Sequence, residues 1–129
     1  MTTAEREKYI WGRLTAAGMT PAGAAGLMGN LYAESGLDPC NLQNTYEKKL
    51  GLTDAAYTAA VDAGTYTNFA RDGAGYGLAQ WTYWSRKEAL LAYVRAAGRS
   101  VGDLETQLGF LIQELAGSFK GVLSTLKTA

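Results

Sequence analysis

Apolar residues recur every three or four positions along most of the chain, which is the spacing of one face of an α-helix. The clearest such stripe follows Thr20-Pro21 and consists of Ala24, Leu27, Met28 and Leu31. Threonine is a favoured N-cap, and proline suits the first helical turn. Gly36 and Pro39 then supply stop signals. The pattern predicts a helix that begins at Pro21 and ends near Ser35, and Gly26 and Gly29 would let another backbone come close to it.

The same spacing predicts further helices over residues 3–17, 53–63, 85–97, 101–116 and 119–126. Thr3 is the expected cap of the first of these helices. Ser85 and Glu88 have the spacing of a capping box. Residues 40–52 show no helical period and are interpreted as an irregular loop.

One segment departs from the helical period. Tyr66–Ala70 and Tyr76–Gln80 flank the glycine-rich run Arg71–Gly75, a pattern typical of a β-hairpin. The predicted fold class is therefore α+β and mostly α-helical, with a small hairpin at one side of a cleft. No linker or internal repeat divides the chain, so residues 1–129 are expected to form one domain.

The amino-acid composition limits which kinds of catalysis and which partners are possible. The 129 residues include 12 basic and 12 acidic side chains, so no long-range attraction to nucleic acid is expected. No apolar run is long enough to span a bilayer, and the polar Thr2–Lys8 segment does not predict a signal peptide. The chain has no histidine and a single cysteine, Cys40, which excludes Ser-His-Asp triads, Cys-His dyads and an internal disulfide. No cofactor and no metal are expected, and catalysis is left to carboxylate, lysine, tyrosine or hydroxyl groups.

Glu34 is the most unusual acidic residue. It follows Leu31 by three residues and Leu27 by seven, which places it on the apolar face at the end of the predicted helix. Glutamate is rarely buried without a partner, and an apolar environment favours the protonated form of a carboxyl group. A general acid that works near neutral pH needs such an environment. The alternative is that the helix has frayed by residue 34 and the side chain points into water.

The glycine-rich segment carries candidate substrate-binding residues, namely Tyr76, Gln80, Trp81 and Tyr83. Aromatic rings stack on the apolar faces of sugars, and an amide both donates and accepts hydrogen bonds to hydroxyl or N-acetyl groups. The competing interpretation is that about half of the aromatic residues here simply fill the core.

Two segments together resemble the phage tail lysozyme family of the lysozyme-like superfamily. They are Gly29–Pro39, which contains Ala33-Glu34-Ser35, and Gly75–Thr82, which reads Gly-Tyr-Gly-Leu-Ala-Gln-Trp-Thr. Arg86-Lys87 and Gln107–Leu115 are similar as well, so the resemblance runs from about Gly26 to Leu115.

The resemblance implies a lysozyme-like fold and bacterial peptidoglycan as the partner. It implies cleavage of the β-1,4 bond between N-acetylmuramic acid and N-acetylglucosamine, with Glu34 as the catalytic acid and Gln80 in contact with the glycan. We expect a monomeric catalytic domain. The lack of a basic surplus and of a wall-binding repeat suggests that it is cut from a longer tail protein or from an endolysin that is released from the host cytoplasm at lysis.

The second catalytic carboxylate has more than one candidate. Animal-type lysozymes have an aspartate directly before the Tyr-Gly of the hairpin, but here that position is Gly75. Asp72 is the expected second catalytic residue, and Asp38 and Glu47 are further candidates. Retaining, inverting and lytic transglycosylase chemistry therefore all stay open.

Two other classes also fit the sequence, because a fold does not fix a function. The chain can be a carbohydrate-binding module of the cell wall that kept the fold without the chemistry. It can also be a helical protein-interaction domain that uses Trp11, Trp81 and Trp84 as contact anchors.

Overall fold

The computed structural model describes residues 1–129 and contains seven α-helices and one 3₁₀ helix, η1, but no β-sheet. The elements are α1 (Thr3–Ala16), α2 (Pro21–Ser35), α3 (Asn44–Leu50), α4 (Asp54–Ala63), η1 (Phe69–Arg71), α5 (Trp84–Ala96), α6 (Leu104–Ala116) and α7 (Lys120–Thr128). The mostly helical architecture predicted from the sequence is thus confirmed, whereas its β component is absent.

Local capping signals explain where most helices begin. The Thr20 side chain accepts a hydrogen bond from the Gly23 amide at the start of α2, and Gly36 ends that helix with a φ of +64°. Helix α1 is instead capped by Thr2, whose side chain forms a reciprocal capping box with Glu5. Thr3, the predicted cap, is already helical.

Two helix starts differ from the prediction. The box expected from Ser85 and Glu88 does not form, because α5 already begins at Trp84 and its N-cap, Tyr83, makes no side-chain capping bond. Helix α6 begins three residues later than predicted, since the Asp103 carboxylate accepts the Thr106 amide and fixes the start there.

Helix α3 lies inside the segment that the sequence predicted to be an irregular loop. It has seven residues, none of them buried, and no side-chain capping bond at its start. It therefore lacks the apolar stripe from which a helix is recognised in a sequence.

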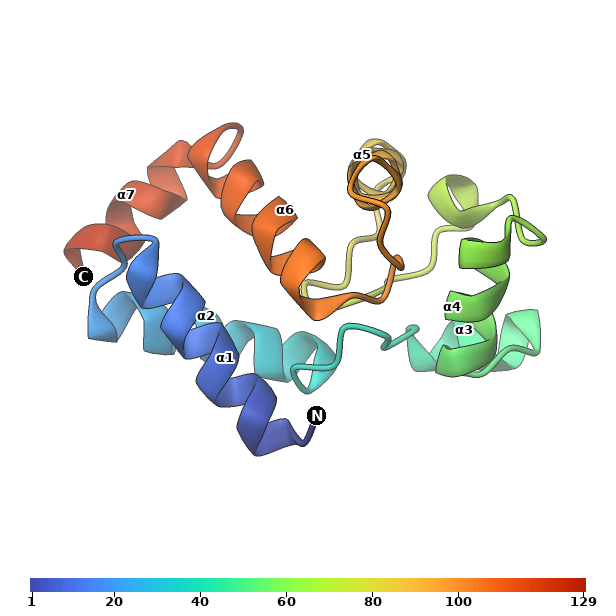
Figure 1. The fold of residues 1–129 in the computed structure, drawn as a ribbon, viewed down its shortest axis with the longest axis horizontal. Coiled ribbons are helices and arrows are strands. Elements are labelled where there is room, and N and C mark those ends of the chain that lie inside the picture. The colour runs from blue at the N-terminus through green and yellow to red at the C-terminus, as the bar shows by residue number, and fades with distance from the viewer.

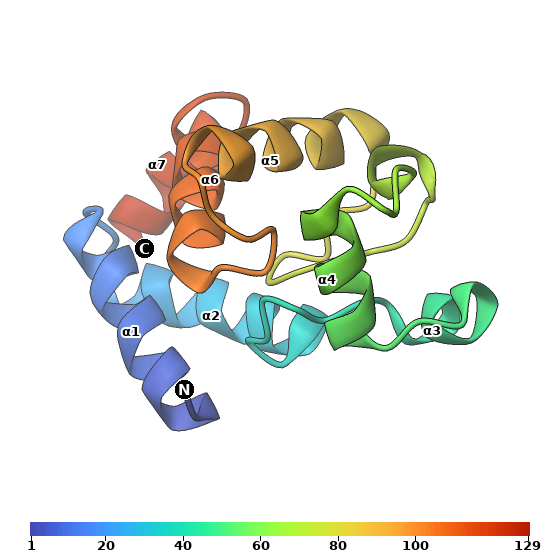
Figure 2. The ribbon, with the colours of Figure 1, turned by 45° about the vertical axis from the view of Figure 1, so that its right-hand side comes forward.

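The helices gather at two ends of the molecule. Figure 1 shows α1, α2, α6 and α7 together at one end and α3 with α4 at the other, and Figure 2 keeps the same grouping after rotation. Helix α7 crosses α2 at Gly23, where an added Cβ would lie 1.9 Å from the Leu126 carbonyl oxygen. Gly26 and Gly29, which the sequence analysis expected to be close to another backbone, have no such neighbour.

The predicted β-hairpin does not form. Residues 66–70 do not run beside residues 76–80; they turn into η1 and place Phe69 in the core. Tyr76 instead makes isolated bridges to Leu42 and Trp81. The amide of Gln80 donates to the Gly77 carbonyl, so residues 77–80 close a tight turn. The glycine-rich segment thus finds its backbone partners in residues 41–43 and in its own turn.

A buried ion pair organises the segment that precedes this turn. Lys87 Nζ lies 2.6 Å from Asp72 Oδ1, and both side chains are almost inaccessible, at 0% and 1% exposure. The hydroxyls of Tyr57 and Tyr66 donate to Asp72 Oδ2 at 2.6 and 2.8 Å. Lys87 also donates to the Ala74 carbonyl at 2.7 Å and lies over the Phe69 ring. Burial lowers the pKa of Lys87, and the Asp72 carboxylate opposes that shift.

We expect Lys87→Met to destabilise the protein by about 3–5 kcal/mol, because it leaves the Asp72 charge buried without its cation. Urea unfolding followed by circular dichroism measures the loss. The double variant Lys87→Met/Asp72→Asn removes both charges and should recover a large part of it. Equal stability of Lys87→Met and the unmodified chain would contradict this assignment.

Candidate active site

Glu34 occupies the last turn of α2 and is exposed to solvent. Its carboxylate takes part in neither of the two ion pairs of the protein. The predicted burial of Glu34 on the apolar stripe is therefore wrong, although the helix has not frayed, since α2 continues through Ser35. The reason is that Leu31 and Ser35 fill the inward positions of the last turn, and Glu34 lies beside them at the edge of the stripe.

A small pocket of about 250 Å³ contains Glu34. The side chains that line it come from the end of α2, the following loop, the start of α3 and the Gly77–Gln80 turn: Glu34, Asn41, Gln43, Asn44, Thr45 and Gln80. Glu34 is the only ionisable residue among them. The fold thus brings Glu34 and Gln80, two residues singled out in the sequence, to one site.

Ser35 fixes the end of α2 against the turn. Its buried hydroxyl lies 2.7 Å from the Leu78 carbonyl oxygen and 3.0 Å from that of Leu31. The Asn41 side chain donates to the Ser35 carbonyl at 3.0 Å. These bonds connect the turn at Leu78 and the loop at Asn41 to Ser35, the residue that follows Glu34. They therefore restrict where the Glu34 carboxylate can point.

Gln107, in α6, fixes the turn at Leu78 from the side of the core. Its fully buried amide accepts a hydrogen bond from the Leu78 N–H at 3.0 Å and donates to the carbonyls of Pro39 and Val101, both at 2.7 Å. Three loop segments are thereby joined through one side chain. Gln107 lies in a predicted helix and opens a segment that is similar to the family, but no role was predicted for it, since no sequence signal distinguishes a buried glutamine from an exposed one.

Gln80 is held in an uncommon conformation. Its φ is +50°, in the left-handed region that few residues other than glycine adopt. Its Nε2 donates to the carbonyls of Asn41 and Gly77 at 2.8 and 3.0 Å. Such strain concentrates at functional sites, and here it turns the Gln80 side chain into the pocket of Glu34.

Of the other predicted substrate-binding residues, only Tyr83 is accessible. Tyr76 and Trp81 are fully buried, and they bond to Thr58 and Glu114 respectively. Neither lines the pocket, so both belong to the fraction of aromatic residues that fills the core. Tyr83 is 64% exposed and lies against Trp84, which is 40% exposed, with ring centroids 6.1 Å apart.

No candidate for the second carboxylate lines the Glu34 pocket. Asp72 is not free to swing toward it, because its carboxylate is buried with Lys87. Asp38 accepts the Cys40 amide in a turn of its own loop. Glu47 lies beside Asp54, and the hydrogen bond between these carboxyl groups raises the pKa of Glu47.

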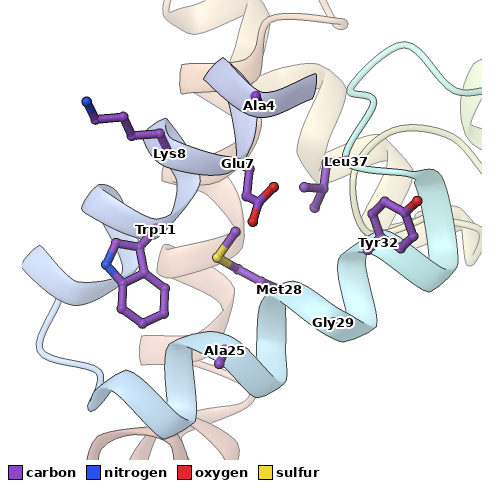
Figure 3. Close-up of a pocket in the computed structure, with 9 residues that line it drawn as sticks. All are labelled: Ala4, Glu7, Lys8, Trp11, Ala25, Met28, Gly29, Tyr32 and Leu37. Carbon is purple, nitrogen blue, oxygen red and sulfur yellow. The ribbon is translucent and has the colours of Figure 1, made fainter. Parts of the chain in front are cut away.

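The largest cavity lies elsewhere, between α1 and α2 (Figure 3), with a volume of about 670 Å³. Trp11 and Met28 line it from the two helices, and Tyr32 and Leu37 lie at its far end. Glu7 also points into it, but Glu34 and Gln80 take no part in it. This cavity is mainly apolar and separate from the pocket of Glu34.

The remaining side chains offer little support for a metal site or for a reactive thiol. No group of three or more Cys, Asp or Glu residues is placed to hold a metal ion. Burial raises the pKa of the Cys40 thiol, which disfavours the reactive thiolate. None of the helices combines the length and the apolar character needed to cross a bilayer.

Comparison with protein families places the chain in a known family. A family model described as phage tail lysozyme matches residues 5–129, nearly the whole chain. The chain belongs to the phage tail lysozyme family. No curated protein and no solved structure gives a significant match. Membership of this family indicates a peptidoglycan-lytic enzyme in a phage or cell-wall context.

The Ser35 hydroxyl gives a test of how the pocket is held. Ser35→Ala leaves the Leu78 carbonyl without this buried donor, so we expect a loss of about 1–3 kcal/mol in unfolding free energy. Activity on cell walls should fall as well, because the Glu34 turn is less fixed. Ser124→Ala, at an exposed position of α7, is the matched control. Unchanged stability and activity in Ser35→Ala would contradict the positioning role.

Proposed function

We propose that this phage tail lysozyme is a glycosidase that cleaves the β-1,4 bond between N-acetylmuramic acid and N-acetylglucosamine, with Glu34 as the general acid. The observation that carries the proposal is that Glu34 is the only ionisable side chain in the polar pocket beside Gln80. An unpaired carboxyl group at such a site has no structural partner to satisfy, and it is free to bond to a ligand.

In the proposed reaction the Glu34 carboxyl gives its proton to the glycosidic oxygen as the bond to the anomeric carbon breaks. The departing sugar keeps that oxygen as a hydroxyl, and positive charge develops on the ring that remains. A glycan seated in the pocket displaces water from the reacting groups, which strengthens the electrostatic interactions between them.

The step that follows is proposed to proceed without a carboxylate nucleophile from Asp72. A retaining enzyme places its two carboxyl groups about 5–5.5 Å apart, whereas Asp72 is buried in an ion pair and does not line the pocket. Attack by water gives a hydrolase, which is our first proposal. Attack by the sugar's own hydroxyl gives a lytic transglycosylase, the second candidate, and the pocket with a single carboxylate is compatible with it.

The exposed pair formed by Tyr83 and Trp84 is proposed as an additional surface for sugar rings. The Arg71 guanidinium lies 4.2 Å from the Trp84 ring centroid and holds that ring from one side. Tyr83 precedes α5 and lies three residues after Gln80 in the sequence.

We further propose that residues 1–129 form a single catalytic domain that acts as a monomer.

The test of the proposed function is product analysis of purified peptidoglycan by mass spectrometry. We expect the unmodified protein to release muropeptides with reducing-end N-acetylmuramic acid. Glu34→Gln should lower the rate by about 10²–10⁴-fold, because it removes the proton donor and retains the side-chain shape. Glu88→Gln, at an exposed position of α5, is the matched control with an unchanged rate.

Other products would change the assignment. Reducing-end N-acetylglucosamine would move the cleaved bond, and 1,6-anhydro products would identify a lytic transglycosylase. Binding to cell walls without any released saccharide would instead establish a carbohydrate-binding module. If Glu34→Gln loses its activity because it is largely unfolded at the assay temperature, as a fall in its melting temperature would reveal, Glu34 is a structural residue.

A further inference from the structure

Two glutamine side chains converge above Gly75 inside the Glu34 pocket. An added Cβ on Gly75 would lie 2.8 Å from Gln80 Oε1 and 3.3 Å from Gln43 Oε1. Gln43 comes from the residue before α3 and Gln80 from the tight turn. The Thr82 hydroxyl oxygen lies 3.3 Å from the same point. The position at which animal-type lysozymes have an aspartate side chain is thus occupied here by two neutral amides and a hydroxyl.

Hydrogen bonds fix which way each amide faces. Both hydrogens of Gln80 Nε2 are used, on the carbonyls of Asn41 and Gly77, so its Oε1 remains a free acceptor. Gln43 Oε1 accepts the Gly75 N–H at 3.0 Å, so its Nε2 hydrogens remain free donors. In the whole protein the only buried side-chain polar atom without a partner is Arg6 Nε. The free atoms of the two glutamines are therefore not fully buried, and both residues line the pocket.

A free donor and a free acceptor on neighbouring amides match a secondary amide of a ligand. The N–H of such a group can donate to Gln80 Oε1, and its carbonyl oxygen can accept from Gln43 Nε2. A free ammonium group in the same place can satisfy Gln80 alone and would leave the Gln43 donor unpaired. A site built to bond a particular polar group rejects the analogue that lacks it, because the site's own groups lose their partners.

We propose that Gln43 and Gln80 form an amide clamp that recognises the 2-acetamido group of the amino sugar bound next to Glu34. This inference rests on the proposed function and deepens it, since it makes Gln43 a specificity-determining residue that selects N-acetylated over N-deacetylated glycan. The strained φ of Gln80 supports the proposal. Glycine would adopt that turn conformation without cost, but it would supply no acceptor.

Binding to the inactive Glu34→Gln protein tests the clamp independently of turnover. Calorimetric titration compares oligomers of N-acetylglucosamine with the N-deacetylated oligomers of equal length. We expect the acetylated oligomer to bind about 10- to 100-fold more tightly, the factor that loss of one or two hydrogen bonds produces. Adding Gln43→Met should remove most of this difference, whereas adding Gln113→Met at an exposed position of α6 should preserve it.

A second substitution guards against misfolding of the first. Gln43→Glu keeps an oxygen acceptor for the Gly75 amide and replaces the proposed donor with a carboxylate oxygen, whose charge also attracts the ammonium groups of the N-deacetylated oligomer. It too should abolish the preference for the acetylated oligomer, or reverse it, while the circular dichroism spectrum is unchanged. Equal affinity of Glu34→Gln for both oligomers, or a preference that survives in both Gln43 variants, would overturn the clamp.

Turnover separates failure of the clamp from failure of the proposed function. The otherwise unmodified protein should cleave native peptidoglycan about 10- to 100-fold faster than the same material after N-deacetylation, and chemical re-acetylation should restore the rate. Equal cleavage of both materials would overturn the clamp and leave the glycosidase intact. No saccharide release from either material would overturn both.

Discussion

The buried amide of Gln107 joins stretches of backbone that no sheet connects. Between Leu37 and Thr82 the only β-pairing consists of isolated bridges, yet several peptide groups outside the helices of this region are buried and must find partners. Gln107 bonds to Leu78, Pro39 and Val101 at once. Its carbonyl also explains Gly77, because a Cβ there would lie 2.8 Å from Gln107 Oε1. The tight turn that carries Gln80 is thereby pressed against α6.

A buried side chain also gathers backbone and side-chain groups in the segment that precedes the turn. The Asp72 carboxylate gathers two tyrosine hydroxyls, the Ala74 amide and the Lys87 ammonium. Side-chain groups therefore replace the ladder of backbone bonds that a hairpin would have supplied. Since each of these groups is buried, removal of one leaves the others unsatisfied, and the cost is large. The acidic residue that sequence analysis selected as the second catalytic carboxylate is used to hold the fold.

This arrangement determines what the pocket can offer a substrate. Ser35 and Gln80 hold the end of α2 next to the turn, so the carboxylate of Glu34 faces only amides and a hydroxyl. In the proposed function, Glu34 transfers the proton and the neutral groups recognise the substrate. The proposed amide clamp likewise uses neutral groups, because two glutamine side chains lie above Gly75.

Local signals in the sequence determined much of the helical framework and the family. Thr20, Pro21 and Gly36 fix the ends of α2 by capping and by backbone preference, which act within a few residues. The motifs around Glu34 and Gln80 were sufficient to expect a phage tail lysozyme, and the family match over residues 5–129 confirmed it. Tertiary structure decided the rest, because burial depends on distant partners. It turned Glu34 outward, placed Tyr76 and Trp81 in the core, and paired Asp72 with Lys87. It also brought Gln43 and Gln80 to the same glycine, Gly75, because the loop before α3 bonds to that residue.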